Sequence, residues 1–162
     1  MKKKKNTLLK FLLLITAFAL IGLNSHGQSI PSYQNYSAGL NPSQQQDLVD
    51  LNYGEQTTAF NNASGLTVIG NGSAQVLDIN ASDFNGINFN NPLLSNVKLV
   101  RIRYSSGSDF QQPINLTGLS LLNNLQYVHL LSSINASAAQ LNSAFVNIPN
   151  AISTYYSISI PN

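Results

Sequence analysis

Six side chains that could contact a ligand lie in three short segments of this 162-residue chain. They are Asp78, Lys98, Arg101, Arg103, Tyr127 and His129. Basic groups bind anions and a tyrosine ring can stack on a sugar, so this set favours an anionic or hydroxylated ligand. The alternative is a solvated strand face, on which an exposed pair such as Asp78 and Arg101 is worth less than about 1 kcal/mol.

The sequence offers no pattern typical of catalysis or metal binding. It has no cysteine and no Gly-x-Ser-x-Gly motif, and His129 is the one histidine outside the first 27 residues. A zinc site needs several ligands at suitable spacing, which the segments around His129 do not provide. We therefore expect no metal, no cofactor and no enzymatic activity, with His129 as a solvated or packed structural residue.

A recurring hydrophobic spacing indicates which elements position these side chains. Four segments carry apolar residues with the spacing L-x-x-L-x-L or a fainter copy of it. They are Ala74, Leu77 and Ile79; Val97, Val100 and Ile102; Leu125, Val128 and Leu130; and Tyr155, Ile158 and Ile160. The spacing predicts parallel strands that bury these residues on one side. On the other side, open to solvent, one row across the sheet should be Asp78, Arg101, His129 and Ser159.

The segment Asn115 to Leu130, with the sequence NLTGLSLLNNLQYVHL, resembles the leucine-rich-repeat family. The resemblance extends over residues 74–162, although repeat lengths are uneven and Ser stands where the family has Asn or Cys. It implies a curved parallel sheet whose concave face binds a partner, usually a protein and sometimes a glycan. The expected fold class is α/β, a short leucine-rich-repeat-like solenoid of about four parallel strands.

Local signals predict the elements that close the N-terminal end of this solenoid. Residues from Asn41 to Gly54 have a cap residue, an early proline and a terminal glycine, which predicts a helix that caps the first edge. Its buried side should be Leu48, Leu51 and Val49. Residues 66–69 and 74–79 should form an antiparallel hairpin around Gly70-Asn71-Gly72.

Two further signals lie between the predicted strands. Leu116, Leu119, Leu122 and Leu125 are three residues apart, which predicts a 3₁₀-like approach to the strand that follows. An outer helix should run from Ala138 to about Asn147, begin after Asn135 or Ser137 and end before Pro149. Its buried stripe should be Leu141, Phe145 and Ile148.

Residues 1–27 are typical of a secretory signal peptide. Lys2 to Lys5 precede an apolar run from Phe11 to Leu23, which is too short to span a membrane. Cleavage after Gly27 would leave residues 28–162 as one domain, with a lead-in and cap over 28–73 and repeats over 74–162. We expect a secreted or periplasmic bacterial protein without stable membrane insertion once the leader is removed.

Loss of the leader reverses the sign of the net charge. Five of the eight basic residues lie within it, so three basic residues remain against six acidic ones, a net charge of −3. Nucleic-acid binding needs clustered Lys and Arg to neutralise phosphates, so this composition argues against it.

Together these patterns predict a non-catalytic binding module that recognises a protein or a cell-surface glycan through the exposed face of its sheet. One alternative is a structural or adhesive β-sandwich of the cell envelope, which would pair residues 97–103 and 125–131 antiparallel. A glycan-acting hydrolase is the third, and it would depend on Asp78, Asp83, Asp109 or His129.

Overall fold

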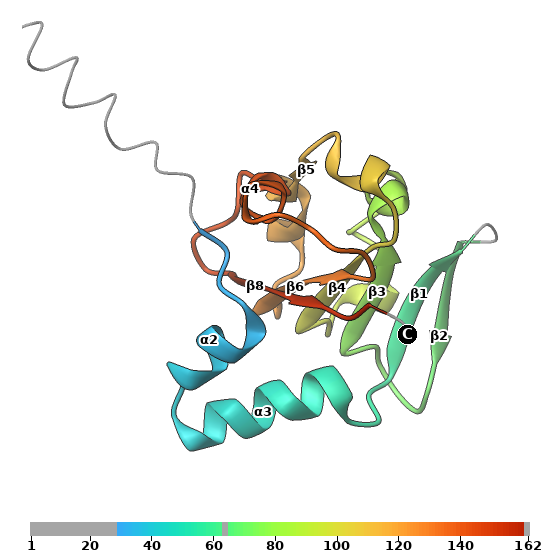
Figure 1. The fold of residues 1–162 in the computed structure, drawn as a ribbon. Coiled ribbons are helices and arrows are strands. Elements are labelled where there is room, and N and C mark those ends of the chain that lie inside the picture. The colour runs from blue at the N-terminus through green and yellow to red at the C-terminus, as the bar shows by residue number, and fades with distance from the viewer. Residues whose placement is uncertain (1–28, 63–64, 161–162) are drawn as a thin grey trace, which may run out of the picture.

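The computed structural model describes residues 29–62 and 65–160, and its centre is a six-stranded sheet (Figure 1). The strands are β1 (Thr58–Asn62), β2 (Gly65–Ile69), β3 (Val76–Asn80), β4 (Leu99–Tyr104), β6 (Tyr127–Ser132) and β8 (Ser153–Ile158). Their order is β2-β1-β3-β4-β6-β8, and every neighbouring pair is parallel except β1 and β2. The fold is therefore mixed α/β with a mostly parallel sheet. The predicted signal peptide lies outside the described residues.

The pairing of β4 with β6 separates two of the expected folds. Val100 pairs with Val128 and Ile102 with Leu130, in parallel. This confirms the parallel arrangement of the central strands, and the antiparallel pairing that a β-sandwich requires is wrong for these segments.

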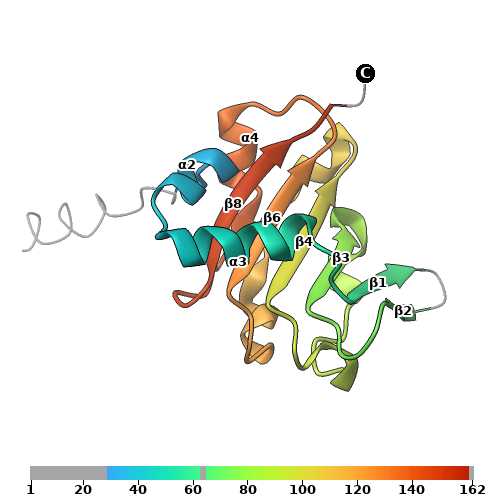
Figure 2. The same cartoon turned by 90° about the horizontal axis from the view of Figure 1, so that it is seen from below.

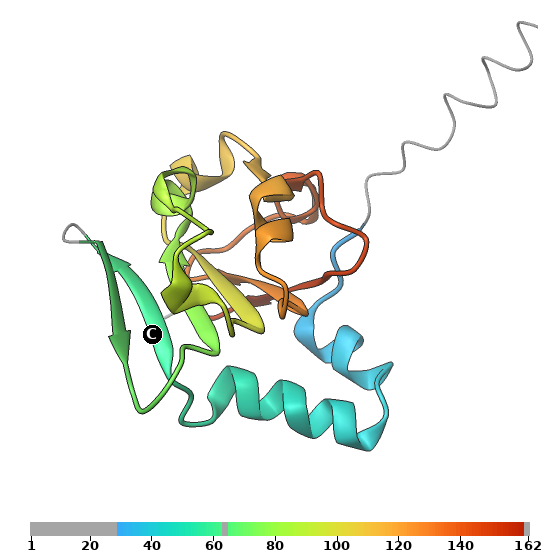
Figure 3. The same ribbon diagram turned by 180° about the vertical axis from the view of Figure 1, so that it is seen from behind.

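One face of the sheet packs against short 3₁₀ turns, a helix and a small second sheet (Figures 1 and 3). These elements are η1 (Ala81–Gly86), η2 (Pro92–Leu94), η3 (Gly107–Phe110), β5 (Ile114–Asn115), η4 (Leu116–Leu121), α4 (Ala138–Ser143) and β7 (Phe145–Val146). Leu116 and Leu119 are fully buried in η4, which confirms the predicted 3₁₀ approach. The outer helix ends at Ser143, earlier than expected, because Phe145 leaves it to pair with Ile114.

The opposite face of the sheet is covered by two helices, α2 (Tyr33–Ala38) and α3 (Pro42–Tyr53). Figure 2 shows α3 crossing over the strands, so the prediction that this helix caps the first edge is wrong. The start of α3 was predicted correctly: Asn41 caps the helix and exchanges reciprocal hydrogen bonds with Gln44. Leu48 and Leu51 are buried as expected, whereas Val49 is 39% exposed.

The N-terminal hairpin exists but uses other strands than the sequence predicted. β1 pairs antiparallel with β2, and β3 joins the other side of β1 in parallel. The glycines between β2 and β3 therefore belong to a wider connection around β1 rather than to a tight turn. Gly70 has a φ of 117°, and a Cβ there would lie 2.8 Å from the Thr57 Cα, so this position needs glycine.

Candidate functional site

The predicted row of polar side chains exists across the three central strands. Asp78 pairs with Arg101 and Arg101 with His129 in the parallel register, as the hydrophobic spacing indicated. The fourth member is Tyr155 rather than Ser159. The predicted frame therefore lies four residues too late: Ile158 at the end of β8 and Ile160 after it are 38% and 57% exposed, while Tyr155 is fully buried.

The expectation that this row is open to solvent is wrong. Leu48 and Leu51 of α3 pack with Val76 and Leu99 of the sheet, beside Tyr127 and Tyr155. Exposure is 3% for Asp78, 3% for His129 and 9% for Tyr127. The helices therefore cover most of the face that was expected to bind a partner.

Asp78 connects two arginines beneath this cover. Its Oδ2 accepts a hydrogen bond from Arg101 Nη1 at 2.9 Å, and both of its oxygens accept from Arg103. Arg101 Nη2 also donates to the Asn52 carbonyl at 3.0 Å, which ties the end of α3 to the sheet. The hydrogen bonds with Asp78 raise the pKa of Arg103 above its usual value. This is a partly buried network, unlike the solvated pair considered as an alternative.

His129 lies in the middle of the covered row. Its ring is 4.7 Å from the Tyr155 ring and 6.4 Å from the Tyr33 ring, between centroids. The pKa of His129 is lowered to about 3, mainly by burial and also by the charge of Arg101, while Asp78 acts in the opposite direction. Neither ring nitrogen has a hydrogen-bond partner among the described residues. The imidazole is therefore uncharged near neutral pH, and its packing is that of a structural residue.

The low pKa of His129 should make the protein acid-sensitive. In the unfolded chain His129 binds a proton near pH 6.5, whereas in the folded protein it does so only near pH 3. The contribution of neutral His129 to stability is therefore fully present above pH 6.5 and is lost as the pH falls toward about 3. Between these two pH values, each drop of one pH unit should lower the free energy of unfolding by about 1.4 kcal/mol because of His129. In urea unfolding, the loss from about pH 7 to about pH 5 should be about 2 kcal/mol smaller for His129→Leu than for the parent chain. Equal losses would show that His129 protonates freely in the folded protein.

A hollow of about 390 Å³ remains open where the helices end, and we call it the large hollow. It is lined by Gln34, Asn52, Tyr53, Arg101, His129, Leu131, Ser157, Ile158 and Ser159. Tyr53, the last residue of α3, is 67% exposed at this site and contacts Tyr33 edge to face. The large hollow thus combines amide, hydroxyl and guanidinium groups with one exposed aromatic ring.

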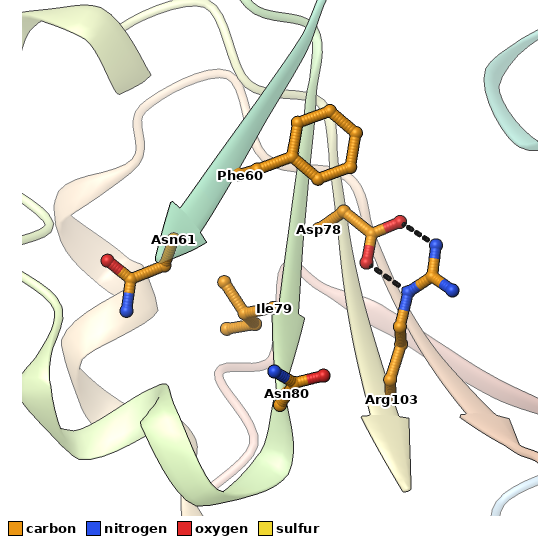
Figure 4. Close-up of a pocket in the computed structure, with 6 residues that line it drawn as sticks. All are labelled: Phe60, Asn61, Asp78, Ile79, Asn80 and Arg103. Atoms are coloured by element: carbon orange, nitrogen blue, oxygen red, sulfur yellow. Dashed lines mark hydrogen bonds and ion pairs between the residues drawn. The ribbon is translucent and has the colours of Figure 1, made fainter. Parts of the chain in front are cut away.

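A second hollow of about 260 Å³, the small hollow, lies over β1, β3 and β4 (Figure 4). It is lined by Phe60, Asn61, Asp78, Ile79, Asn80 and Arg103. Figure 4 shows Arg103 turned toward Asp78, with Phe60 above the carboxylate. Arg101 borders the large hollow and Arg103 the small one, so the network lies between the two.

Lys98 does not belong to this group of side chains. It is exposed at the start of β4 and lines a third hollow of about 180 Å³ with Asp47 and Asp50. The structure therefore brings together Asp78, Arg101, Arg103 and His129, places Tyr127 in the core under α3, and separates Lys98 from all of them. Tyr53 and Asn52 were missed, although an aromatic residue directly before the glycine that ends a helix was a usable signal.

Metal-binding clusters and membrane-spanning helices are not found in the described part of the chain. Within residues 29–62 and 65–160, no three His, Cys, Asp or Glu side chains are grouped so as to hold a metal ion. Over the same ranges no helix is both long and apolar enough to cross a membrane. Comparison of the chain with protein-family models, with curated proteins and with solved structures found no match.

Proposed function

We propose that this chain is an exported, non-catalytic binding module that recognises a glycan at the uncovered end of the helix-covered sheet face. The observation that carries the proposal is the large hollow, where Tyr53 is 67% exposed beside polar side chains. Sugar-binding sites need this combination, because a flat ring packs against the apolar face of the sugar while amides and hydroxyls bind its hydroxyl groups.

The polar lining favours a ligand with many hydroxyl groups. Gln34 offers an amide, Asn52 offers its amide oxygen, and Ser157 and Ser159 each offer a hydroxyl at the same hollow. Asn52 is already engaged, since its amide nitrogen donates to the Leu48 carbonyl at 2.8 Å and to the Tyr155 hydroxyl at 2.9 Å. Such bonds hold the side chain in one orientation, which reduces the entropy lost on binding.

Two parts of the proposal rest on the sequence. The leader-like residues 1–27 support export to the periplasm or the cell exterior. The apolar spacing in the first three segments, together with the parallel order β3-β4-β6-β8, supports a leucine-rich-repeat-like solenoid as the finer description of the fold.

A protein partner is the second candidate. It is favoured by apolar surface at the large hollow, where Tyr53 is 67% and Ile158 is 38% exposed. Exposed aromatic side chains are common energetic anchors of protein interfaces.

A glycan array followed by titration calorimetry tests the proposal with the full chain. We expect binding to at least one class of oligosaccharide, and Tyr53→Ala should weaken it about tenfold because the stacking ring is lost. Leu121→Ala is the matched control, since Leu121 is 50% exposed in η4 on the opposite side of the sheet. Absence of binding to every oligosaccharide would refute the proposal, and so would equal affinities of the two variants.

A further inference from the structure

The network between the two hollows contains more positive than negative charge. One carboxylate, Asp78, is shared by Arg101 and Arg103, and these are the two ion pairs of the described residues. Part of the excess is offset on the Arg101 side, where the guanidinium also meets the carbonyl end of α3 at Asn52. Among the described residues, no backbone carbonyl accepts a hydrogen bond from the Arg103 side chain, which donates to Asp78.

Arg103 is held in one orientation while part of it stays open. Its Nε and Nη2 both donate to Asp78, so the carboxylate occupies one edge of the guanidinium. A guanidinium has five N–H donors in a planar fork, which leaves the Nη1 edge for a second acceptor. The Asp78 side chain is 2% exposed and that of Arg103 is 48% exposed, so the free edge can be reached from solvent.

The surroundings of Arg103 also favour a negatively charged ligand. Among residues 29–62 and 65–160, no Asp or Glu lines the large hollow, and Asp78, which is already paired, is the one acidic residue that lines the small hollow. Asp83 lies beyond Asn80, which donates to it at 3.0 Å, and Asp83 also accepts from Ser82. The carboxylate of Asp83 is therefore itself engaged in hydrogen bonds.

The two hollows together extend from β1 to β8. Adjacent strands are about 4.8 Å apart, so these five strands span about 19 Å across the sheet. This length suits an extended chain of sugars better than a single sugar.

We propose that the ligand is an oligosaccharide that carries a carboxylate, and that Arg103 binds this carboxylate through its free guanidinium edge. Asp78 is then a positioning residue, which holds Arg103 in place without contacting the ligand. This inference rests on the proposed glycan-binding function and specifies its ligand class.

The test compares ligands in which the carboxylate is either free or blocked as an uncharged methyl ester. Oligogalacturonate is titrated into the full chain beside its methyl-esterified form, and sialyllactose is titrated beside its sialic acid methyl ester. We expect the charged member of one pair to bind at least about tenfold more tightly, and which pair responds distinguishes uronic acids from sialic acids.

Two variants locate the effect at the proposed site. Arg103→Gln should remove most of the preference for the charged ligand, measured as the ratio of the affinities for the charged and the uncharged form. Ser159→Asp adds a negative charge at the exposed rim of the large hollow and should also reduce the preference, without disturbing Asp78. Ser95→Asp is the matched control, because Ser95 is exposed directly after η2, on the side of the β4 start, whereas Arg103 lies near the β4 end.

The outcomes separate the two proposals. Equal binding of the charged and uncharged members would overturn the carboxylate inference while the glycan-binding function stands. A preference that survives in both Arg103→Gln and Ser159→Asp would overturn the assignment to Arg103. Failure of all four ligands, together with an empty glycan array, would overturn both proposals.

Discussion

Replacing Asp78 by Asn should lower the free energy of unfolding by about 3–5 kcal/mol. The Asp78 side chain is 2% exposed and accepts hydrogen bonds from both Arg101 and Arg103. Asparagine keeps the shape but removes the charge, which leaves Arg101, whose side chain is 17% exposed, without its counter-charge. Breaking a buried pair in this way costs far more than breaking a solvated one. Urea unfolding near neutral pH measures the effect.

Asp47→Asn provides the matched control for this substitution. Asp47 is also an aspartate, but it is exposed on α3 and forms no ion pair within the described part of the chain. Its replacement should change the free energy of unfolding by no more than about 0.5 kcal/mol. Similar small effects of both substitutions would mean that Asp78 belongs to a solvated pair, as on an open strand face.

Tyr155→Ala should likewise destabilise the protein by about 3–5 kcal/mol. The Tyr155 ring is fully buried, stacks on Tyr36 with centroids 5.3 Å apart and lies 4.7 Å from the His129 ring. Its hydroxyl also pairs with the Asn52 amide. Truncation therefore leaves a large cavity between the helices and the sheet and removes the partner of Asn52. Thermal or urea unfolding of the two chains gives the difference.

Ile160→Ala also tests the register of β8, at a residue that this register leaves exposed. Ile160 is 57% exposed, so its truncation should cost less than about 0.5 kcal/mol. In the register predicted from the hydrophobic spacing, Ile160 would be a core residue and would cost several times more. A loss of about 2 kcal/mol or more at Ile160 would therefore contradict the observed register.

The covered face carried a signal in the sequence that the hydrophobic spacing alone did not use. Strands β3 and β4 are apolar on both sides, since Val76 and Leu99 alternate with the core residues Leu77 and Val100. Near-continuous apolar strands are typical of parallel sheets that are covered on both faces. Val76 and Leu99 thus indicated a second layer, and Leu48 and Leu51 of α3 were the available apolar partners.

The spacing selected the wrong register for β8 because the observed register places the polar Thr154 at a position where the repeat has an apolar residue. Ile158 and Ile160 match the repeat, whereas the structure turns Thr154 and Tyr156 toward the same side as Val128 and Leu130. The aromatic cover over Tyr155 favours the observed alignment, and a shift would expose this ring. That cover comes from Tyr33 and Tyr36, more than a hundred residues earlier in the chain.

The sequence by itself determined the parallel alignment of β3, β4 and β6, the start of α3 and the 3₁₀ approach at Leu116. These features depend on spacing and capping within short segments, which side-chain alternation and local hydrogen bonds set directly. Only the tertiary structure decided that α3 covers the sheet, that Tyr155 is buried and that Arg103 stays open beside Asp78. Those outcomes depend on contacts between distant residues, such as Asn52 and Tyr155, which are 103 residues apart. The sequence pattern within a short segment does not show which distant segment will pack against it.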